Sequence, residues 1–120
     1  MSELVNAKTR NYVADATERT QRMATKKGRY VIVRTYSAGC FAGNLVSRKG
    51  KEVVLANARR LWHWDGAASL SELAQRGTSK PRNCMFPVAM DRVELTEAIE
   101  VIDVTKAAEK SIKGVPVWTR

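Results

Sequence analysis

From residue 29 onward the chain consists of short apolar runs separated by turn residues at intervals of about ten positions, the spacing of an antiparallel meander. The runs are rich in β-branched and aromatic residues, which favour strands. Gly43 is expected to mark a bulge or a close backbone approach, and Asn57 a bulge between the third and fourth strands. The first four strands are predicted at residues 30–37, 40–47, 52–58 and 59–64.

The second half of the chain predicts two short helices. Ser69 and Glu72 have the S-x-x-E spacing of a capping box, so a helix should begin there, and Gly77 should end it. Thr105 is expected to cap a second helix, "KAAEKSIK", which Gly114 closes. Three further strands are predicted at 92–95, 98–104 and 115–118, the last at a sheet edge because it contains proline.

Together these elements predict an α+β fold, a curled antiparallel β-meander or small barrel with two short helices and a basic N-terminal arm. Residues 29–120 are expected to form a single domain. Residues 1–28 are polar and basic, with a partly helical stretch expected over 13–23. Because such an arm cannot bury enough surface alone, we expect it to dock on its own domain, a second subunit or a partner. A homo-oligomer is therefore expected.

The net charge of +9 is unevenly distributed. Residues 30–87 carry nine Lys and Arg against three Asp and Glu, whereas residues 88–120 carry five against six. This imbalance favours an anionic partner (a nucleotide, nucleic acid or an acidic protein surface) over a charge that serves solubility alone. The acidic residues from Glu94 to Asp103 are expected to form a solvated face or, alternatively, an assembly surface.

The segment "RRLWHW" carries the most chemistry. On a strand, Trp62 and Trp64 would share one face with Arg60, and Arg59 and His63 the other. Core packing is favoured for at least one indole, and a stacking role for one at the rim of a cleft. If the loop over 78–87 folds back, its cations would join these arginines around an aromatic wall suited to phosphates and bases. The candidate anion-binding residues are Arg59, Arg60, Trp64, Lys80 and Arg82.

Catalytic and metal chemistry find little support. His63 is the one histidine of the chain; Asp65 could pair with it, but no nucleophile motif accompanies them. Neither a GxxxxGK[ST] nor a GxGxxG loop is present. Cys40 and Cys84 are isolated and expected to be reduced apolar fillers. We therefore expect no catalytic residue, no metal and no cofactor. No apolar run approaches roughly 18 residues, so no membrane partner is expected either.

Several stretches between about residues 30 and 118 resemble a family of small phage and prophage proteins of uncharacterised function. They are "YVIVRTYSAGCFAG", "GKEVVLANARRLWHWDGAASLSELAQRGTSKPRNCMF", "LTEAIEVI" and "SIKGVPVW", with W-x-W-x-GAASL as a signature. The resemblance implies a phage origin, no established activity and no catalytic residues.

The expected function is that of a non-enzymatic phage protein in the host cytoplasm that engages an anionic partner. That partner would be a host-defence nucleotide signal, or a nucleic-acid-bearing or acidic host complex, which the protein would inhibit or sequester. The alternative is a structural virion or assembly protein whose N-terminal arm contacts neighbouring subunits or DNA.

Overall fold

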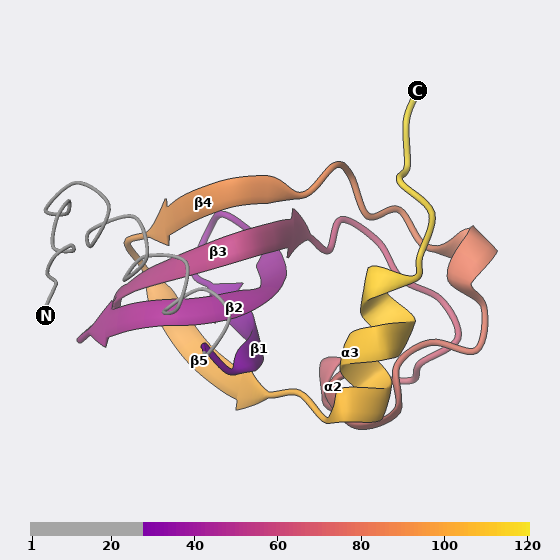
Figure 1. The fold of residues 1–120 in the computed structure, drawn as a ribbon, viewed down its shortest axis with the longest axis horizontal. Coiled ribbons are helices and arrows are strands. Elements are labelled where there is room, and N and C mark those ends of the chain that lie inside the picture. The colour runs from indigo at the N-terminus through magenta and orange to yellow at the C-terminus, as the bar shows by residue number, and fades with distance from the viewer. Residues whose placement is uncertain (1–27) are drawn as a thin grey trace, which may run out of the picture.

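The computed structural model describes residues 28–120, and these residues form a five-stranded antiparallel sheet with two α-helices (Figure 1). The predicted α+β class is confirmed. Apart from Gly28, the predicted N-terminal arm lies outside the described residues. The elements are β1 (Tyr30–Thr35), β2 (Cys40–Lys49), β3 (Glu52–Arg60), α2 (Leu70–Arg76), the 3-10 helix η1 (Pro81–Asn83), β4 (Met90–Leu95), β5 (Ala98–Asp103) and α3 (Lys106–Lys113).

The sheet is curled and open, with the strand order β4-β3-β2-β1-β5 (Figure 1). Each strand pairs with the next along the chain as far as β4, and β5 then returns to pair with β1. As a result β4 and β5 are consecutive in sequence yet form the two opposite edges. The connection between β3 and β4 is long and carries α2 and η1, so this helical segment is inserted into an otherwise simple meander.

A bulge interrupts the pairing of β2 with β3, as predicted. The register shifts between Ala42 and Asn44, and Asn57 on the facing strand adopts a φ of 50°. A Cβ atom added to Gly43 would lie 3.0 Å from the Ala56 carbonyl oxygen, so the backbones also approach closely there. Asn57 does not separate two strands, however, because β3 continues to Arg60.

Two predicted strands are wrong. The first two residues of "RRLWHW" extend β3, where Arg60 pairs with Phe41, and the remainder makes one isolated bridge between His63 and Met85. The chain leaves the sheet after Arg60 because its backbone groups are taken by the loop that folds back from residue 85. Residues 115–118 likewise form no strand, and Val117 makes an isolated parallel bridge to Phe86.

Two hydrophobic clusters lie on opposite sides of β1. Val31 and Val33 face the interior of the curl together with Phe41, whereas Tyr30 and Ile32 face the helices. Alternate residues of a strand point to opposite faces, so a strand covered on both sides is an unbroken apolar run. We call the cluster that faces the helices the helix-side core. It contains Tyr30, Ile32, Ala42, Leu61, Leu73, Ala74, Cys84, Phe86, Ile112 and Val115.

Both helices begin at the predicted caps. The Ser69 hydroxyl accepts a hydrogen bond from the Glu72 amide at 3.1 Å, and the Glu72 carboxylate accepts one from the Ala68 amide at 2.6 Å. The Thr105 hydroxyl accepts a bond from the Ala108 amide at 3.1 Å, so α3 begins as expected. The Thr105 hydroxyl also donates to a carbonyl near the end of α2, which ties the two helices together.

Tyr30 should make stability depend on pH in the alkaline range. Burial, and secondarily the charge of Glu109, raises its pKa from 10.0 to about 12. Its phenol must stay protonated in the folded state, so stability is full below pH 10 and falls as the pH rises towards 12. Relative to Tyr30→Phe, the native chain should lose about 2 kcal/mol over that interval, measured by chemical denaturation. Tyr36→Phe, at an exposed tyrosine, should not alter this dependence.

Candidate functional site

The loop after α2 folds back over the segment that follows β3. The Met85 amide donates to the His63 carbonyl at 2.8 Å, and the Thr78 hydroxyl donates to the Asp65 carbonyl. Gly66 makes this contact feasible: its φ is 83°, and a Cβ atom there would lie 2.5 Å from the Lys80 amide nitrogen. The WDG sequence therefore belongs to a fixed turn on which neighbouring side chains are displayed.

Asp65 supports this turn. Its carboxylate accepts bonds from the Asn83 side-chain amide at 3.0 Å and from the Gly66 amide at 2.8 Å. These hydrogen bonds lower the pKa of Asp65, and the bond from Asn83 has the larger effect. No hydrogen bond joins His63 to Asp65 within residues 28–120, and His63 is exposed.

The two tryptophans of this segment have different surroundings. Trp64 is half-buried and packs against the helix-side core, which confirms that at least one indole belongs to the core. Trp62 leaves 64% of its surface exposed. The side chain available for stacking is therefore Trp62, which the prediction passed over in favour of Trp64.

Arg59 is buried and serves the fold. Only 6% of the residue is exposed, and its guanidinium lies over the Phe86 ring, 5.5 Å from the centroid. Its five N–H groups meet five backbone carbonyls, so it lines no surface open to a partner. Burial lowers the pKa of Arg59, but a guanidinium stays charged at neutral pH. The acceptors are the carbonyls of Phe86, Pro87, Ile112, Val115 and Pro116.

Arg60 and Trp62 line a cleft beside the turn between β1 and β2. The cleft has a volume of about 340 Å³, and its other lining residues are the turn residues 37–40 and Leu61. The Arg60 guanidinium stacks on Phe41, 4.5 Å from the ring centroid, and donates to the Ala38 carbonyl at 3.2 Å. We call this the Arg60–Trp62 cleft.

Thr35 stabilises the turn between β1 and β2 that lines the cleft. Its hydroxyl accepts a bond from the Ala38 amide at 2.9 Å and donates to the Gly39 carbonyl at 2.7 Å. Cys40 lies half-buried at the end of this turn, and burial raises the pKa of its thiol. Cys40 and Cys84 are both free, as predicted, so the turn is held by hydrogen bonds and not by a disulfide.

The remaining predicted cations do not join this cleft by any contact among the described residues. Lys80 and Arg82 are exposed in and beside η1, at one end of the long axis, whereas the turn between β2 and β3 lies at the other (Figure 1). That turn carries Arg48, Lys49 and Lys51, and we call it the basic hairpin. The C-terminal end of β3, where the cleft begins, lies between the two groups (Figure 1).

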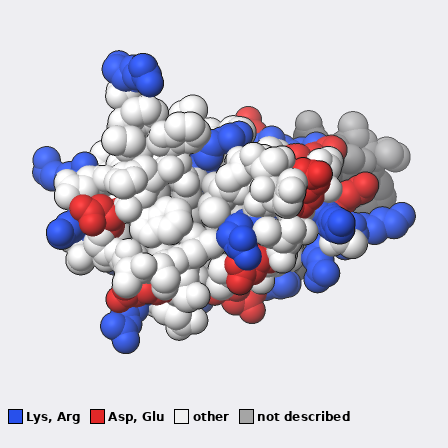
Figure 2. All heavy atoms as spheres, turned by 180° about the vertical axis from the view of Figure 1, so that it is seen from behind, with Lys and Arg blue, Asp and Glu red and all other residues white. Residues whose placement is uncertain are grey.

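The acidic C-terminal part neutralises arginines of the sheet. Arg29 pairs with Asp103 at 2.8 Å and Arg34 with Glu100 at 2.9 Å. No such ion pair reaches the basic hairpin, Lys80 or Arg82 within residues 28–120. Figure 2 shows the face opposite to Figure 1, where blue and red groups lie on both sides of the molecule and much of the area between them is uncharged. The cations are thus divided into separate groups and not gathered on one side.

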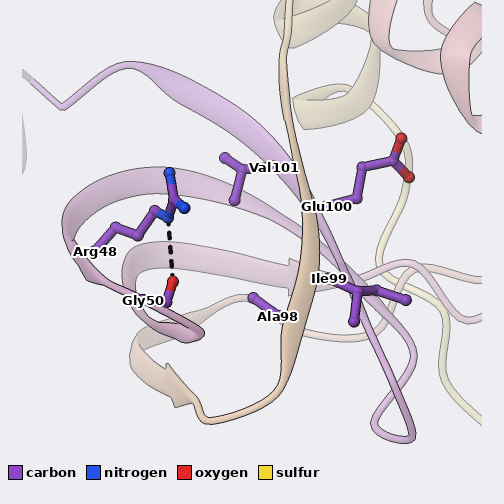
Figure 3. A pocket seen from close by; sticks show the side chains of 6 residues that line it. All are labelled: Arg48, Gly50, Ala98, Ile99, Glu100 and Val101. Atoms are coloured by element: carbon purple, nitrogen blue, oxygen red, sulfur yellow. Dashed lines mark hydrogen bonds between the residues drawn. The ribbon is translucent and has the colours of Figure 1, made fainter.

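A second hollow lies between the basic hairpin and β5 (Figure 3). Its volume is about 160 Å³, below the roughly 300 Å³ at which ligand pockets begin. The Arg48 guanidinium donates to the Gly50 carbonyl at 3.2 Å, and the Glu100 carboxylate points away from the hollow (Figure 3). That carboxylate accepts a hydrogen bond from Arg34 at 2.9 Å. This hollow is the weaker candidate.

Over residues 28–120, no His, Cys, Asp and Glu side chains cluster in threes or more to hold a metal ion. Within the same part of the chain, every helix is too short or too polar to span a membrane.

Comparison with known proteins places the chain in a family. Searches of curated proteins and of solved structures found no match. A family model described as "Domain of unknown function (DUF6948)" matches residues 28–112, a range that contains the whole sheet, α2 and the Arg60–Trp62 cleft. The match covers more than half of the sequence, and the chain therefore belongs to this family of unknown function.

Proposed function

We propose that this chain is a non-enzymatic binding protein of phage origin that engages an anionic partner in the host cytoplasm. The observation that carries the proposal is the set of cations without carboxylate partners among the described residues. Among them are the basic hairpin at one end and the Lys80–Arg82 group at the other, with Arg60 between them, and the C-terminal segment adds Lys106, Lys110 and Arg120. The positive electrostatic potential around these cations attracts phosphates and concentrates an anionic ligand near the surface.

A binding role also suits the chemistry of the exposed groups. Guanidinium groups bind phosphate in a planar, bidentate manner, and an indole offers an apolar face to a planar ligand. Arg60 and Trp62 present both groups in one cleft. His63, the best candidate for acid–base catalysis, is exposed and makes no hydrogen bond to Asp65 in the described part of the chain.

Phage origin rests on the resemblance of the W-x-W-x-GAASL stretch, and the structure suggests what that stretch does. Trp64 and Leu70 pack against the helix-side core, Gly66 forms the turn and Ser69 caps α2. Trp62 is the large apolar side chain of the stretch that stays exposed. We take the other positions as the scaffold that holds Trp62.

Removing the charges of the basic hairpin should weaken polyanion binding. For Arg48→Gln/Lys49→Gln/Lys51→Gln, we expect the affinity for a labelled single-stranded oligonucleotide to fall about 10-fold at low salt, because fewer counterions are released. The slope of log K against log salt should decrease by about 2, since each phosphate contact on a single strand contributes about 0.7. Fluorescence anisotropy over a salt series measures both.

The matched control removes three charges that already have carboxylate partners, at Arg29, Arg76 and Arg92. This triple glutamine variant should bind within about 3-fold of the native chain, because neighbouring carboxylates already offset the charge of these three arginines. Equal losses in the two variants would show that net charge alone acts. Absence of binding to single strands, duplexes and polyglutamate alike would refute the proposed function. Native mass spectrometry of the purified chain gives the subunit count and any ligand that copurifies.

A further inference from the structure

We infer that the Arg60–Trp62 cleft is a subsite for one unpaired base of a single-stranded nucleic acid, with an adjoining phosphate on Arg60. The inference deepens the proposed function and rests on it, because it specifies the class of anion. It is carried by an exposed indole and a fixed guanidinium that line one cleft.

Trp62 is displayed on a rigid backbone. The Leu61 amide donates to the Cys40 carbonyl at 2.8 Å, and the Trp62 amide to the Met85 carbonyl at 3.2 Å. Leu61 itself is 3% exposed and belongs to the helix-side core, so the residue before the indole is anchored. A preorganised aromatic face of this kind stacks with any base, since every base has a π-face.

Arg60 is held in place without being neutralised. Stacking on Phe41 and the bond to Ala38 fix the guanidinium, yet that bond uses one of its five N–H donors. No carboxylate pairs with Arg60 among the described residues. The remaining N–H groups can therefore donate charge-assisted hydrogen bonds to the oxygens of a phosphate.

The size and position of the cleft favour a strand over a free nucleotide. About 340 Å³ is near the lower limit for ligand pockets, which suits one base and not a larger ligand. One guanidinium and one indole give weak binding on their own, so affinity must come from further phosphates. β3 has nine residues and therefore spans about 30 Å between the basic hairpin and the cleft. A nucleic-acid strand with one base in the cleft and about this length would also reach other cations of the protein.

The base must be unpaired to reach the indole. Inside a duplex both faces of each base are stacked on neighbours, and aromatic side chains therefore act on single-stranded regions. A duplex can still be attracted by the charge of the protein, but it cannot use Trp62. This difference separates the inference from simple polyanion binding.

The test compares a fluorescein-labelled oligothymidine strand with an abasic strand that has the same number of phosphates. The full-length protein should bind the intact strand about 10- to 100-fold more tightly, the range that one base–aromatic stack supplies. Trp62→Ala should abolish this preference, and Trp62→Phe should retain most of it. Arg60→Gln should weaken binding of both strands. Tyr36→Ala, which removes an exposed aromatic side chain outside the cleft lining, should change neither.

Four outcomes would overturn the inference. Equal binding of intact and abasic strands would leave the proposed function standing and remove the base subsite. Thymidine monophosphate binding as tightly as the strand would make the cleft a mononucleotide site. A change in oligomer mass on Trp62→Ala, seen by light scattering, would show that the indole covers a subunit interface. Failure of every polyanion to bind would refute the inference together with the proposed function.

Discussion

Replacing Arg59 by leucine should lower the free energy of unfolding by about 4 kcal/mol. The change removes the donors that satisfy five carbonyls, among them Ile112 at 3.0 Å and Val115 at 2.8 Å. Each buried acceptor that loses its partner costs about 1–3 kcal/mol, although second lone pairs and water recover part of this. These carbonyls lie in the C-terminal segment and beside Phe86, so Arg59 holds both against β3. Urea denaturation followed by circular dichroism measures the loss.

Two variants determine whether the loss comes from the hydrogen bonds. Arg59→Lys keeps the charge but offers three donors on a flexible chain, so it should lose about half as much. Arg92→Leu removes an exposed arginine that pairs with Glu94 on the surface, and it should cost less than about 0.5 kcal/mol. If Arg59→Leu lowers the free energy of unfolding no more than Arg92→Leu does, then the hydrogen bonds from Arg59 to the five carbonyls do not stabilise the fold.

Gly77→Ala should also lower the free energy of unfolding by about 4 kcal/mol. Gly77 ends α2 with φ 77° and ψ −156°, a region that essentially glycine alone occupies, at a cost of about 1–3 kcal/mol for other residues. A Cβ atom there would also overlap the Cβ of Ser111 on α3, and such overpacking costs about 1–3 kcal/mol. Thermal and chemical denaturation should both report the change.

Gly39→Ala separates strain from overlap. Gly39 has a φ of 92°, but nothing lies within 4 Å of an added Cβ atom, so this substitution should cost about 1–2 kcal/mol. Adding Ser111→Gly to Gly77→Ala should restore part of the loss, although Ser111 gives up its bond to the Thr78 amide. Equal costs for the two alanine variants would contradict a tight contact between the helices.

Elements specified by local chemistry were predictable from the sequence. Ser69 and Thr105 cap helices by bonds to residues three positions ahead, so the residues concerned are visible in a short window. The end of β3 was not predicted, because "RRLWHW" has the composition of a strand. What stops that strand is a set of backbone bonds to residue 85, which no local pattern reveals.

At the candidate site, too, the sequence predicted what a local pattern determines and missed what long-range contacts determine. Alternation along β3 correctly separates Arg59 from Arg60 and places Trp62 on the side of Arg60. It fails at Trp64, because a period of two holds only while the chain stays in the sheet. Composition could not show which arginine is buried. Alternation could not show it either, because each arginine has an apolar neighbour two positions ahead, Leu61 for Arg59 and Trp62 for Arg60.

The pairing of β1 with β5 has a consequence for how the chain acquires its shape during synthesis. Val33 lies opposite Val101, so this seam of the sheet joins segments far apart in the chain. Such distant pairings carry a large loop-closure cost and form slowly. A nascent chain can assemble the β1–β2 and β2–β3 hairpins early, but one edge of β1 stays open until β5 leaves the ribosome. Through that interval the apolar strand Tyr30–Thr35 is the segment most exposed to misassociation.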